Sequence, residues 1–224
     1  MITSLLGNDA STSAQVKLLD IEFPEEFTKK FAGPQFGIDG VREYTKVKGR
    51  PFLLNMVKPC TGLTPEEGAK IFYQTALGGV DFIKDDELLG NPSYSHPADR
   101  VKAFRKAAKA AYEESGNNVK YFVNVTSGTA EIMDNVKAVE DAGADGIMIN
   151  FAAVGYSVLK QVAEETNLPI LGHAAGSGMV YEGTLNGMSS PLAVGKLARL
   201  AGADIVMVNT PYGGYPLSYQ KYMQ

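Results

Sequence analysis

The feature that most constrains the fold is a repeated unit in which a helix ends on glycine and an apolar strand follows. The unit reads Gly-Gly-Val-Asp at 78–81 and Ala-Gly-Ala-Asp at both 142–145 and 201–204. The apolar stretches that follow are largely continuous instead of alternating, which is typical of parallel strands covered by helices. The repeat therefore predicts an α/β fold in which parallel strands alternate with helices.

Six strands and four helices can be placed from this rhythm. Helix 64–77 has a capping threonine, a proline at its first position and a glutamate three residues after the cap. We expect the other helices over 98–115, 130–142 and 190–202. The predicted strands are 52–58, 81–87, 120–126, 146–151, 169–173 and 205–209. A doubly wound sheet and a barrel both fit, although no Gly-x-Gly-x-x-Gly or Walker A motif supports nucleotide binding.

The polar residues at the strand ends favour the barrel. Consecutive ends lie 23 to 37 residues apart, the size of one barrel unit, and barrel enzymes carry their chemistry on this face. We therefore predict a (β/α)₈ TIM-type barrel that is incomplete, with about six units. The polar residues at these ends are Lys58, Lys84, Asp86, Glu87, Asn124, Asn150, His173 and Asn209.

Length and domain organisation suggest a fragment. A complete barrel takes about 250 residues, whereas the chain has 224, of which the first 50 lie outside the repeat. We expect residues 1–32 to be the end of an α+β N-terminal domain with its linker, including a strand within 16–23, and residues 33–224 to be the partial barrel. Because an open barrel exposes an unpaired edge, we expect the chain alone to be poorly soluble and inactive.

Composition excludes several classes of protein. The chain is 45% hydrophobic and 21% charged with a net charge of −4, so it can form a core and has no basic field for nucleic acid or an anionic membrane. No apolar run reaches the roughly 20 residues of a membrane span, and residues 1–10 do not resemble a signal peptide. The single cysteine fits a reducing compartment, so we expect a cytoplasmic protein.

The densest chemistry is the sequence Lys84-Asp85-Asp86-Glu87. In a strand Lys84 and Asp86 point to one face and Asp85 to the other, while Glu87 follows at the strand end. Two converging carboxylates repel unless a cation neutralises them, and oxygen ligands suit Mg²⁺. The alternative is a salt-bridged strand end followed by a solvated turn, which the other five polar strand ends disfavour.

Other strand ends carry further candidates. A lysine at the depth of Lys58 should have a depressed pKa and could transfer protons, although it could also pair with Glu87. His173 could serve the site or be a hydrogen-bonded core residue. Asn124 and Asn150 could each orient substrate hydroxyls or cap the following loop. Cys60 has no assignable base, which disfavours a role as nucleophile.

Three motifs resemble the RuBisCO large-chain family. They are Gly33-Pro34-x-Phe36-Gly37-Ile38-x-Gly40-x-Arg42, Lys58-Pro59-x-x-Gly62-Leu63 and Gly78-Gly79-x-Asp81-Phe82-Ile83-Lys84-Asp85-Asp86-Glu87. Their order and spacing match the family over nearly the whole chain. Gly7-Asn8 also matches, at the end of the family's N-terminal domain.

The resemblance implies roles for these residues. Lys84 matches the lysine that CO₂ converts to a carbamate, which joins Asp86 and Glu87 around Mg²⁺. Lys58 matches the lysine that moves protons at the substrate, and His173 matches the active-site histidine. Asn8 matches a residue that reaches the site of the neighbouring subunit, so the resemblance implies a homodimer for the full-length protein.

Three departures separate the chain from true carboxylases. Cys60 replaces a second lysine, Ala174 an arginine that grips a phosphate, and Ser177 a second histidine. The chain is therefore similar to the RuBisCO-like (form IV) branch, which implies enolisation of a sugar-derived, phosphorylated ketone, as in 2,3-diketo-5-methylthiopentyl-1-phosphate enolase of methionine salvage or a related isomerase. A decarboxylase of an oxidised sugar acid and a non-catalytic relative remain alternatives, and a true carboxylase is disfavoured.

Overall fold

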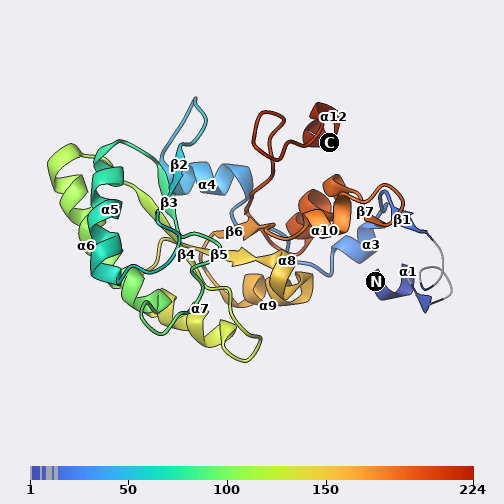
Figure 1. The fold of residues 1–224 in the computed structure, drawn as a ribbon, viewed down its shortest axis with the longest axis horizontal. Helices are drawn as coiled ribbons and strands as arrows, with labels where there is room; N and C mark the ends of the chain where they lie inside the picture. Colours follow the sequence, from blue (N-terminus) through green and yellow to red (C-terminus); the bar gives the residue numbers. More distant parts are fainter. Residues whose placement is uncertain (1, 6, 9–11, 13–14) are drawn as a thin grey trace.

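A single curled sheet of six parallel strands forms the centre of the molecule (Figure 1). The computed structural model describes residues 2–5, 7–8, 12 and 15–224. Each strand pairs with the one that precedes it in this sheet, so the sheet runs in chain order from β2 to β8. The strands are β2 (Leu54–Met56), β3 (Phe82–Lys84), β4 (Lys120–Asn124), β5 (Gly146–Asn150), β6 (Ile170–His173) and β8 (Ile205–Val206). This half-barrel confirms the predicted α/β fold.

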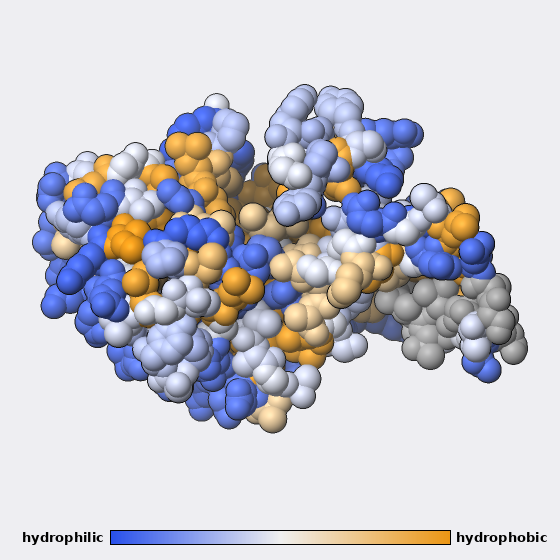
Figure 2. Space-filling model, viewed as in Figure 1, coloured by the Kyte–Doolittle hydropathy of each residue, from blue (hydrophilic) through white to orange (hydrophobic). Residues whose placement is uncertain are grey.

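Helices cover the outer face of the sheet, and their outward surfaces on α6 and α7 are mainly hydrophilic in Figure 2. The Thr64 side chain accepts a hydrogen bond from Glu67 N, and the Glu67 side chain accepts one from Thr64 N, which confirms the predicted capping box. Buried residues of the helices and of the outward strand positions form one large apolar cluster. The covering helices are α5 (Pro65–Leu77), α6 (Pro97–Ser115), α7 (Ile132–Asp141), α8 (Phe151–Val154) and α9 (Tyr156–Glu165).

The inner side of the curled sheet is called the lumen here. A second, smaller apolar cluster fills the part of the lumen that lies toward the amino ends of the strands. Val41 of α4 (Gly37–Thr45) packs there against one buried residue from each of four neighbouring strands. Gly146 leaves room for one of them, because a Cβ on Gly146 would lie 2.5 Å from Cε1 of Phe122. The four strand residues are Phe82, Phe122, Met148 and Leu171.

The repeated aspartates link neighbouring strands. Each precedes a strand, is nearly fully buried, and accepts a backbone N–H at the start of the preceding strand in the sheet. Such charge-assisted bonds are stronger than bonds between neutral groups, so the repeat specifies register as well as turns. The bonds join Leu53 N to Asp81 at 2.8 Å, Tyr121 N to Asp145 at 3.2 Å and Ile170 N to Asp204 at 2.8 Å.

The remaining elements lie beyond β6 and β8. Of the strand predicted within 16–23, only β1 (Lys17–Leu18) forms, and it pairs in parallel with β7 (Gly187–Met188). The helix predicted over 190–202 begins as a π-helix, η1 (Pro191–Lys196), and continues as α11 (Leu197–Leu200). No helix within the described ranges is long and apolar enough to cross a membrane. The other helices are α1 (Ile2–Leu5), α3 (Glu25–Thr28), α10 (Gly178–Tyr181) and α12 (Tyr219–Met223).

Candidate functional site

A polar layer lies directly above the apolar cluster of the lumen. Side chains alternate along a strand, so the residue two positions after each lumen residue also points inward. Because the strands are parallel, their carboxyl ends meet at one end of the half-barrel. The residues of this layer are Lys84 after Phe82, Asn124 after Phe122, Asn150 after Met148 and His173 after Leu171.

Lys84 is the most deeply buried cation of this layer, with 1% of the residue exposed. Its Nζ donates a hydrogen bond to the carbonyl oxygen of Asp85 at 2.9 Å and lies 4.0 Å from Oε2 of Glu87. Burial lowers the pKa of the Lys84 amine below its ordinary value, against the opposing effect of the nearby carboxylates. The amine of Lys84 is therefore neutral more often than the amine of an exposed lysine.

Lys58 and Asp86 form an ion pair at the edge of the lumen, with 2.5 Å between Nζ and Oδ2. The Lys58 side chain is half exposed, and its Nζ also contacts Sγ of Cys60 at 3.0 Å. The depressed pKa predicted for Lys58 is wrong, because the hydrogen bond to Asp86 raises that pKa above its ordinary value. Lys58 also pairs with Asp86 instead of Glu87. The Glu87 carboxylate faces Lys84 and His173.

Glu87 lies between Lys84 and His173. Nε2 of His173 is 3.6 Å from Oε2 of Glu87, and Nδ1 accepts a hydrogen bond from the backbone N–H of Ala175 at 3.1 Å. Burial, followed by the positive charge of Lys84, lowers the pKa of the His173 imidazole. The histidine is thus held neutral, with its proton on Nε2, which faces the Glu87 carboxylate.

Asp85 points away from the lumen, as the strand alternation predicts. It is fully buried and accepts hydrogen bonds from Arg100 Nε at 3.0 Å, Tyr121 OH at 2.5 Å and Asn124 N at 2.8 Å. Arg100, which was not among the residues predicted from the sequence, also donates to the carbonyls of Leu89 and Gly90 that follow the acidic cluster. Its place next to Val101 and four residues before Phe104, on the apolar stripe of α6, was the available signal.

The two lumen asparagines differ in their hydrogen bonds. Asn124 donates from Nδ2 to the carbonyls of Asp86 and Glu87 at 3.2 and 3.1 Å, and its Oδ1 accepts from Thr126 N at 3.0 Å. Asn150 is 9% exposed, and its Oδ1 accepts no hydrogen bond from any described residue. Both side chains reach the polar layer, but only the Asn124 amide is engaged on both sides.

Two further predicted positions lie apart from this layer. Asn8 is exposed, and its side chain accepts a hydrogen bond from Thr12 Oγ1. Among the described residues, no hydrogen bond or ion pair connects Asn8 to the lumen. The strand predicted over 205–209 ends at Val206, so Asn209 is exposed and contacts Tyr181 OH at 3.3 Å. The sheet therefore brings together five of the six polar strand ends.

The anionic oxygen donors beside the polar layer are the carboxylates of Asp86 and Glu87, which suit a hard metal ion. Among the described residues, no three His, Cys, Asp or Glu side chains converge as a metal site. Asp86 and Glu87 are two carboxylates beside one lysine, and the family resemblance implies that a carbamate of Lys84 would supply a third anionic oxygen. The residues present fit a Mg²⁺ site of that kind, because carboxylate and carbamate oxygens are the hard ligands that Mg²⁺ prefers.

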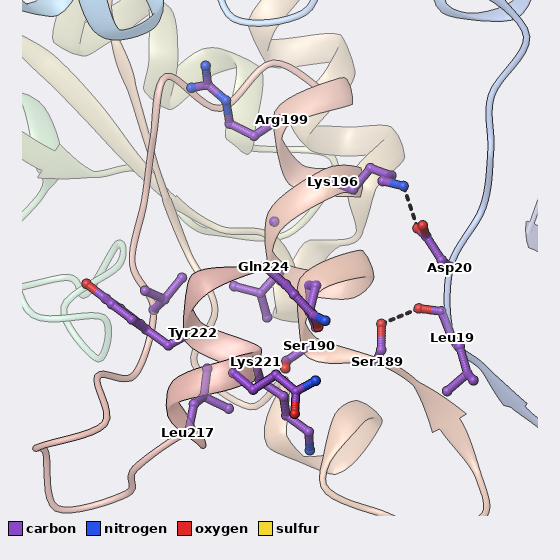
Figure 3. A pocket seen from close by; sticks show the side chains of 15 residues that line it. Leu19, Asp20, Ser189, Ser190, Lys196, Arg199, Leu217, Lys221, Tyr222 and Gln224 are labelled. Atoms are coloured by element: carbon purple, nitrogen blue, oxygen red, sulfur yellow. Dashed lines mark hydrogen bonds and ion pairs between the residues drawn. The ribbon is translucent and has the colours of Figure 1, made fainter.

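A separate cavity of about 1000 Å³ lies between η1 and the C-terminal segment (Figure 3). Two of the cations that line it are engaged: Lys196 pairs at 2.5 Å with Asp20, which lines the same cavity, and Arg199 donates to backbone carbonyls. None of the residues predicted for the chemistry lines this cavity. The polar layer of the lumen is therefore the candidate active site.

Comparison with known proteins gives one family. The model of the ribulose bisphosphate carboxylase large chain, catalytic domain, matches residues 37–218. A ribulose bisphosphate carboxylase-like protein of Archaeoglobus fulgidus is 43% identical over 226 residues, which cover 100% of this chain and 52% of the relative. The 2,3-diketo-5-methylthiopentyl-1-phosphate enolase of Bacillus pumilus is 38% identical over 218 residues, covering 96% of this chain and 54% of the enzyme. The chain spans about half the length of these relatives.

Solved structures give the same answer. A rubisco-like protein (MtnW) from Alicyclobacillus acidocaldarius superposes with a TM-score of 0.92 at 31% identity, covering 99% of this chain and 57% of that one. A dimeric archaeal Rubisco from Hyperthermus butylicus superposes with a TM-score of 0.83 at 37% identity, covering 90% and 48%. The similarity thus extends over nearly all of the chain in both sequence and fold.

Proposed function

We propose that this chain, which belongs to the RuBisCO large-chain family, is the barrel part of a RuBisCO-like enzyme. The reaction that we propose for the whole enzyme is the enolisation of a phosphorylated, sugar-derived ketone. The observation that carries the proposal is the buried Lys84 amine beside the carboxylates of Asp86 and Glu87. A lysine whose pKa is lowered by burial, next to carboxylates, is typical of a site built for chemistry.

Lys84 would first become a metal ligand. Its neutral amine would attack CO₂, so that a C–N bond forms while one C=O π bond opens, and one proton would pass from the nitrogen to solvent; the neutral amine would thus become an anionic carbamate. Asp86, Glu87 and this carbamate would then hold Mg²⁺, which when bound supplies a Lewis acid for negative charge on the ketone oxygen. The lowered pKa of Lys84 supports this step, because only the unprotonated amine reacts.

Lys58 is proposed to transfer protons on one side of this centre, and His173 to orient Glu87 on the other. The ion pair with Asp86 keeps Lys58 protonated before the reaction starts. In this state Lys58 can act only as an acid, and it can act as a base after it has given up its proton. His173 is neutral and presents Nε2 toward Glu87, which orients that carboxylate. Asn124 holds the turn on which Asp86 and Glu87 stand.

The named relatives favour one class of substrate among phosphorylated ketones. The enolase of Bacillus pumilus and the MtnW structure support a methionine-salvage-type 2,3-diketo-5-methylthiopentyl-1-phosphate enolase or a related isomerase. A true carboxylase is disfavoured, since the Ser177 hydroxyl donates to the carbonyl of Ala174 at 2.6 Å and no arginine follows His173. We also propose a cytoplasmic homodimer in which Asn8 approaches the partner's site, in keeping with the dimeric Rubisco of Hyperthermus butylicus.

The test uses the whole protein that contains this chain, purified and given 2,3-diketo-5-methylthiopentyl-1-phosphate with Mg²⁺ and bicarbonate. We expect Lys84→Ala to abolish enol formation, followed by absorbance, because both the carbamate and its charge are lost. Lys102→Ala, an exposed lysine of α6, is the matched control and should leave the rate unchanged. Activity that survives Lys84→Ala would overturn the proposal.

A further inference from the structure

We infer that Asn150 is the lumen amide that recognises the ligand, and that its Oδ1 accepts a hydrogen bond from a hydroxyl group of that ligand. The inference rests on the proposed function for the position of the ligand in the lumen. It separates two asparagines that occupy equivalent places on neighbouring strands, β4 and β5, and that the sequence does not distinguish.

The strand pleat aims Asn150 into the lumen. Met148, two residues earlier, belongs to the inner apolar cluster, while Ile147 and Ile149 belong to the outer one. In the sheet Asn150 is the register partner of His173. Its side chain therefore shares the polar layer with the groups proposed to act on the ligand.

The Asn150 amide oxygen has no structural duty. It is buried, and it accepts no hydrogen bond from any residue the structure describes. Asn150 also stands at the N-cap position of α8, where its side chain makes no cap bond. Leaving a buried polar atom unpaired lowers stability, so a polar group kept in this state calls for another explanation.

Asn124 provides the contrast. It is fully buried, and its amide is engaged on both sides, with two donated bonds to the acidic turn and one accepted from Thr126. We assign it a positioning role for Asp86 and Glu87. Of the two amides, only that of Asn150 offers an unused acceptor to a bound molecule.

An unused acceptor selects a donor. The carbon chain of a hydroxyketone carries an O–H group, whereas a 2,3-diketone carries none until it is enolised. The Asn150 acceptor is therefore expected to bond either the hydroxyl that enolisation creates on a 2,3-diketone or one that a hydroxyketone carries from the start. A site built to bond a hydroxyl discriminates against the analogue that lacks it, because the buried acceptor then stays unpaired.

The first test is thermal unfolding of the whole protein without ligand. Asn150→Leu replaces an unpaired amide with an apolar group of similar size, so its Tm should equal or exceed that of the wild type. Asn124→Leu should lower the Tm, because it removes three hydrogen bonds. If Asn150→Leu lowers the Tm as Asn124→Leu does, the Asn150 amide is structural and the inference is wrong. The comparison with the wild type decides the point even where Asn124→Leu does not fold.

The second test measures binding of two probes that differ by one hydroxyl, dihydroxyacetone phosphate and hydroxyacetone phosphate. The wild type should bind the hydroxylated probe roughly tenfold more tightly, and Asn150→Leu should bind the two equally. No binding of either probe, or a preference that survives Asn150→Leu, would overturn the assignment. Neither test involves Lys84, so its outcome is distinguishable from a failure of the proposed enolisation.

Discussion

At the scale of single residues, the candidate site depends on which charges are paired and where. Lys84 and Asp85 are neighbours in the chain, yet one faces the lumen and the other is clamped by Arg100 on the outer side. Lys58 is paired at the half-exposed rim and Lys84 is buried, so the two lysines have pKa values shifted in opposite directions. The raised pKa suits Lys58 to the role of an acid, and the lowered pKa suits Lys84 to the role of a nucleophile.

Arg100 and Arg105 of α6 offer a matched pair of variants. Arg100→Met should destabilise the protein by about 3–5 kcal/mol, because it leaves the fully buried Asp85 carboxylate without its cation. Arg105→Met removes a half-exposed cation from Asp145, which keeps Lys120 nearby, so its cost should be under about 1 kcal/mol. Urea unfolding measures both, and equal effects of the two changes would refute the clamp role of Arg100.

At the scale of elements, each strand has two different faces and a distinct start and end. The outer face meets helices, the lower inner face forms the lumen cluster, and the carboxyl end carries the polar layer. The repeated aspartates act at the opposite end, where each ties a strand to its neighbour. The stabilising contacts and the candidate site are thus separated along the strands, as the corresponding features are in barrel enzymes.

Gly146 of β5 tests how tightly the lumen is packed. Gly146→Ala places a methyl group 2.5 Å from Cε1 of Phe122, so we expect a loss of about 1–3 kcal/mol in the free energy of unfolding. Gly128→Ala is the control, because a Cβ there meets no atom within 4 Å. Phe122→Leu combined with Gly146→Ala should recover part of the loss; a fully neutral Gly146→Ala in chemical unfolding would contradict the packing.

At the scale of the whole molecule, the candidate site is assembled from the ends of strands far apart in the chain. Lys58 and His173 are separated by 115 positions, and the curl of the sheet brings both to Asp86 and Glu87. A ligand that binds here would link β2, β3 and β6 at once. Binding to the folded state alone raises the stability of the whole fold.

Mg²⁺ and bicarbonate together should therefore raise the Tm of the whole protein, with a stabilisation of about 2.7 kcal/mol at a hundredfold excess over Kd. Mg²⁺ alone, without bicarbonate and under CO₂-free conditions, should give a smaller shift, since only two carboxylates are then available. Differential scanning fluorimetry measures the shift, and chelation by EDTA should reverse it. An undiminished combined shift in Lys84→Ala would show that the lysine is not a ligand.

Several features followed from the sequence because their physical cause is local. Apolar runs, three of them after glycine turns, predicted the six parallel strands, and side-chain alternation predicted that Lys84 and Asp85 diverge. The lengths of three strands were overestimated most: β2, β3 and β8 were predicted over 52–58, 81–87 and 205–209, but form only over Leu54–Met56, Phe82–Lys84 and Ile205–Val206. β2 and β8 each have one neighbour in this sheet, so fewer ladder bonds extend them than extend the central β4 and β5.

What the sequence alone determined is the alternation of strands and helices, the gathering of polar residues at the strand ends, and the family to which their motifs belong. What only the tertiary structure decided is the pairing of those residues: Lys58 pairs with Asp86, and Arg100 with Asp85. It also decided that the Asn124 amide is hydrogen-bonded, whereas Oδ1 of Asn150 has no partner among the described residues. The physical reason is range. Periodicity and turn chemistry act over a few residues, whereas ion pairs, burial and pKa values depend on distances between elements that only the curled sheet sets.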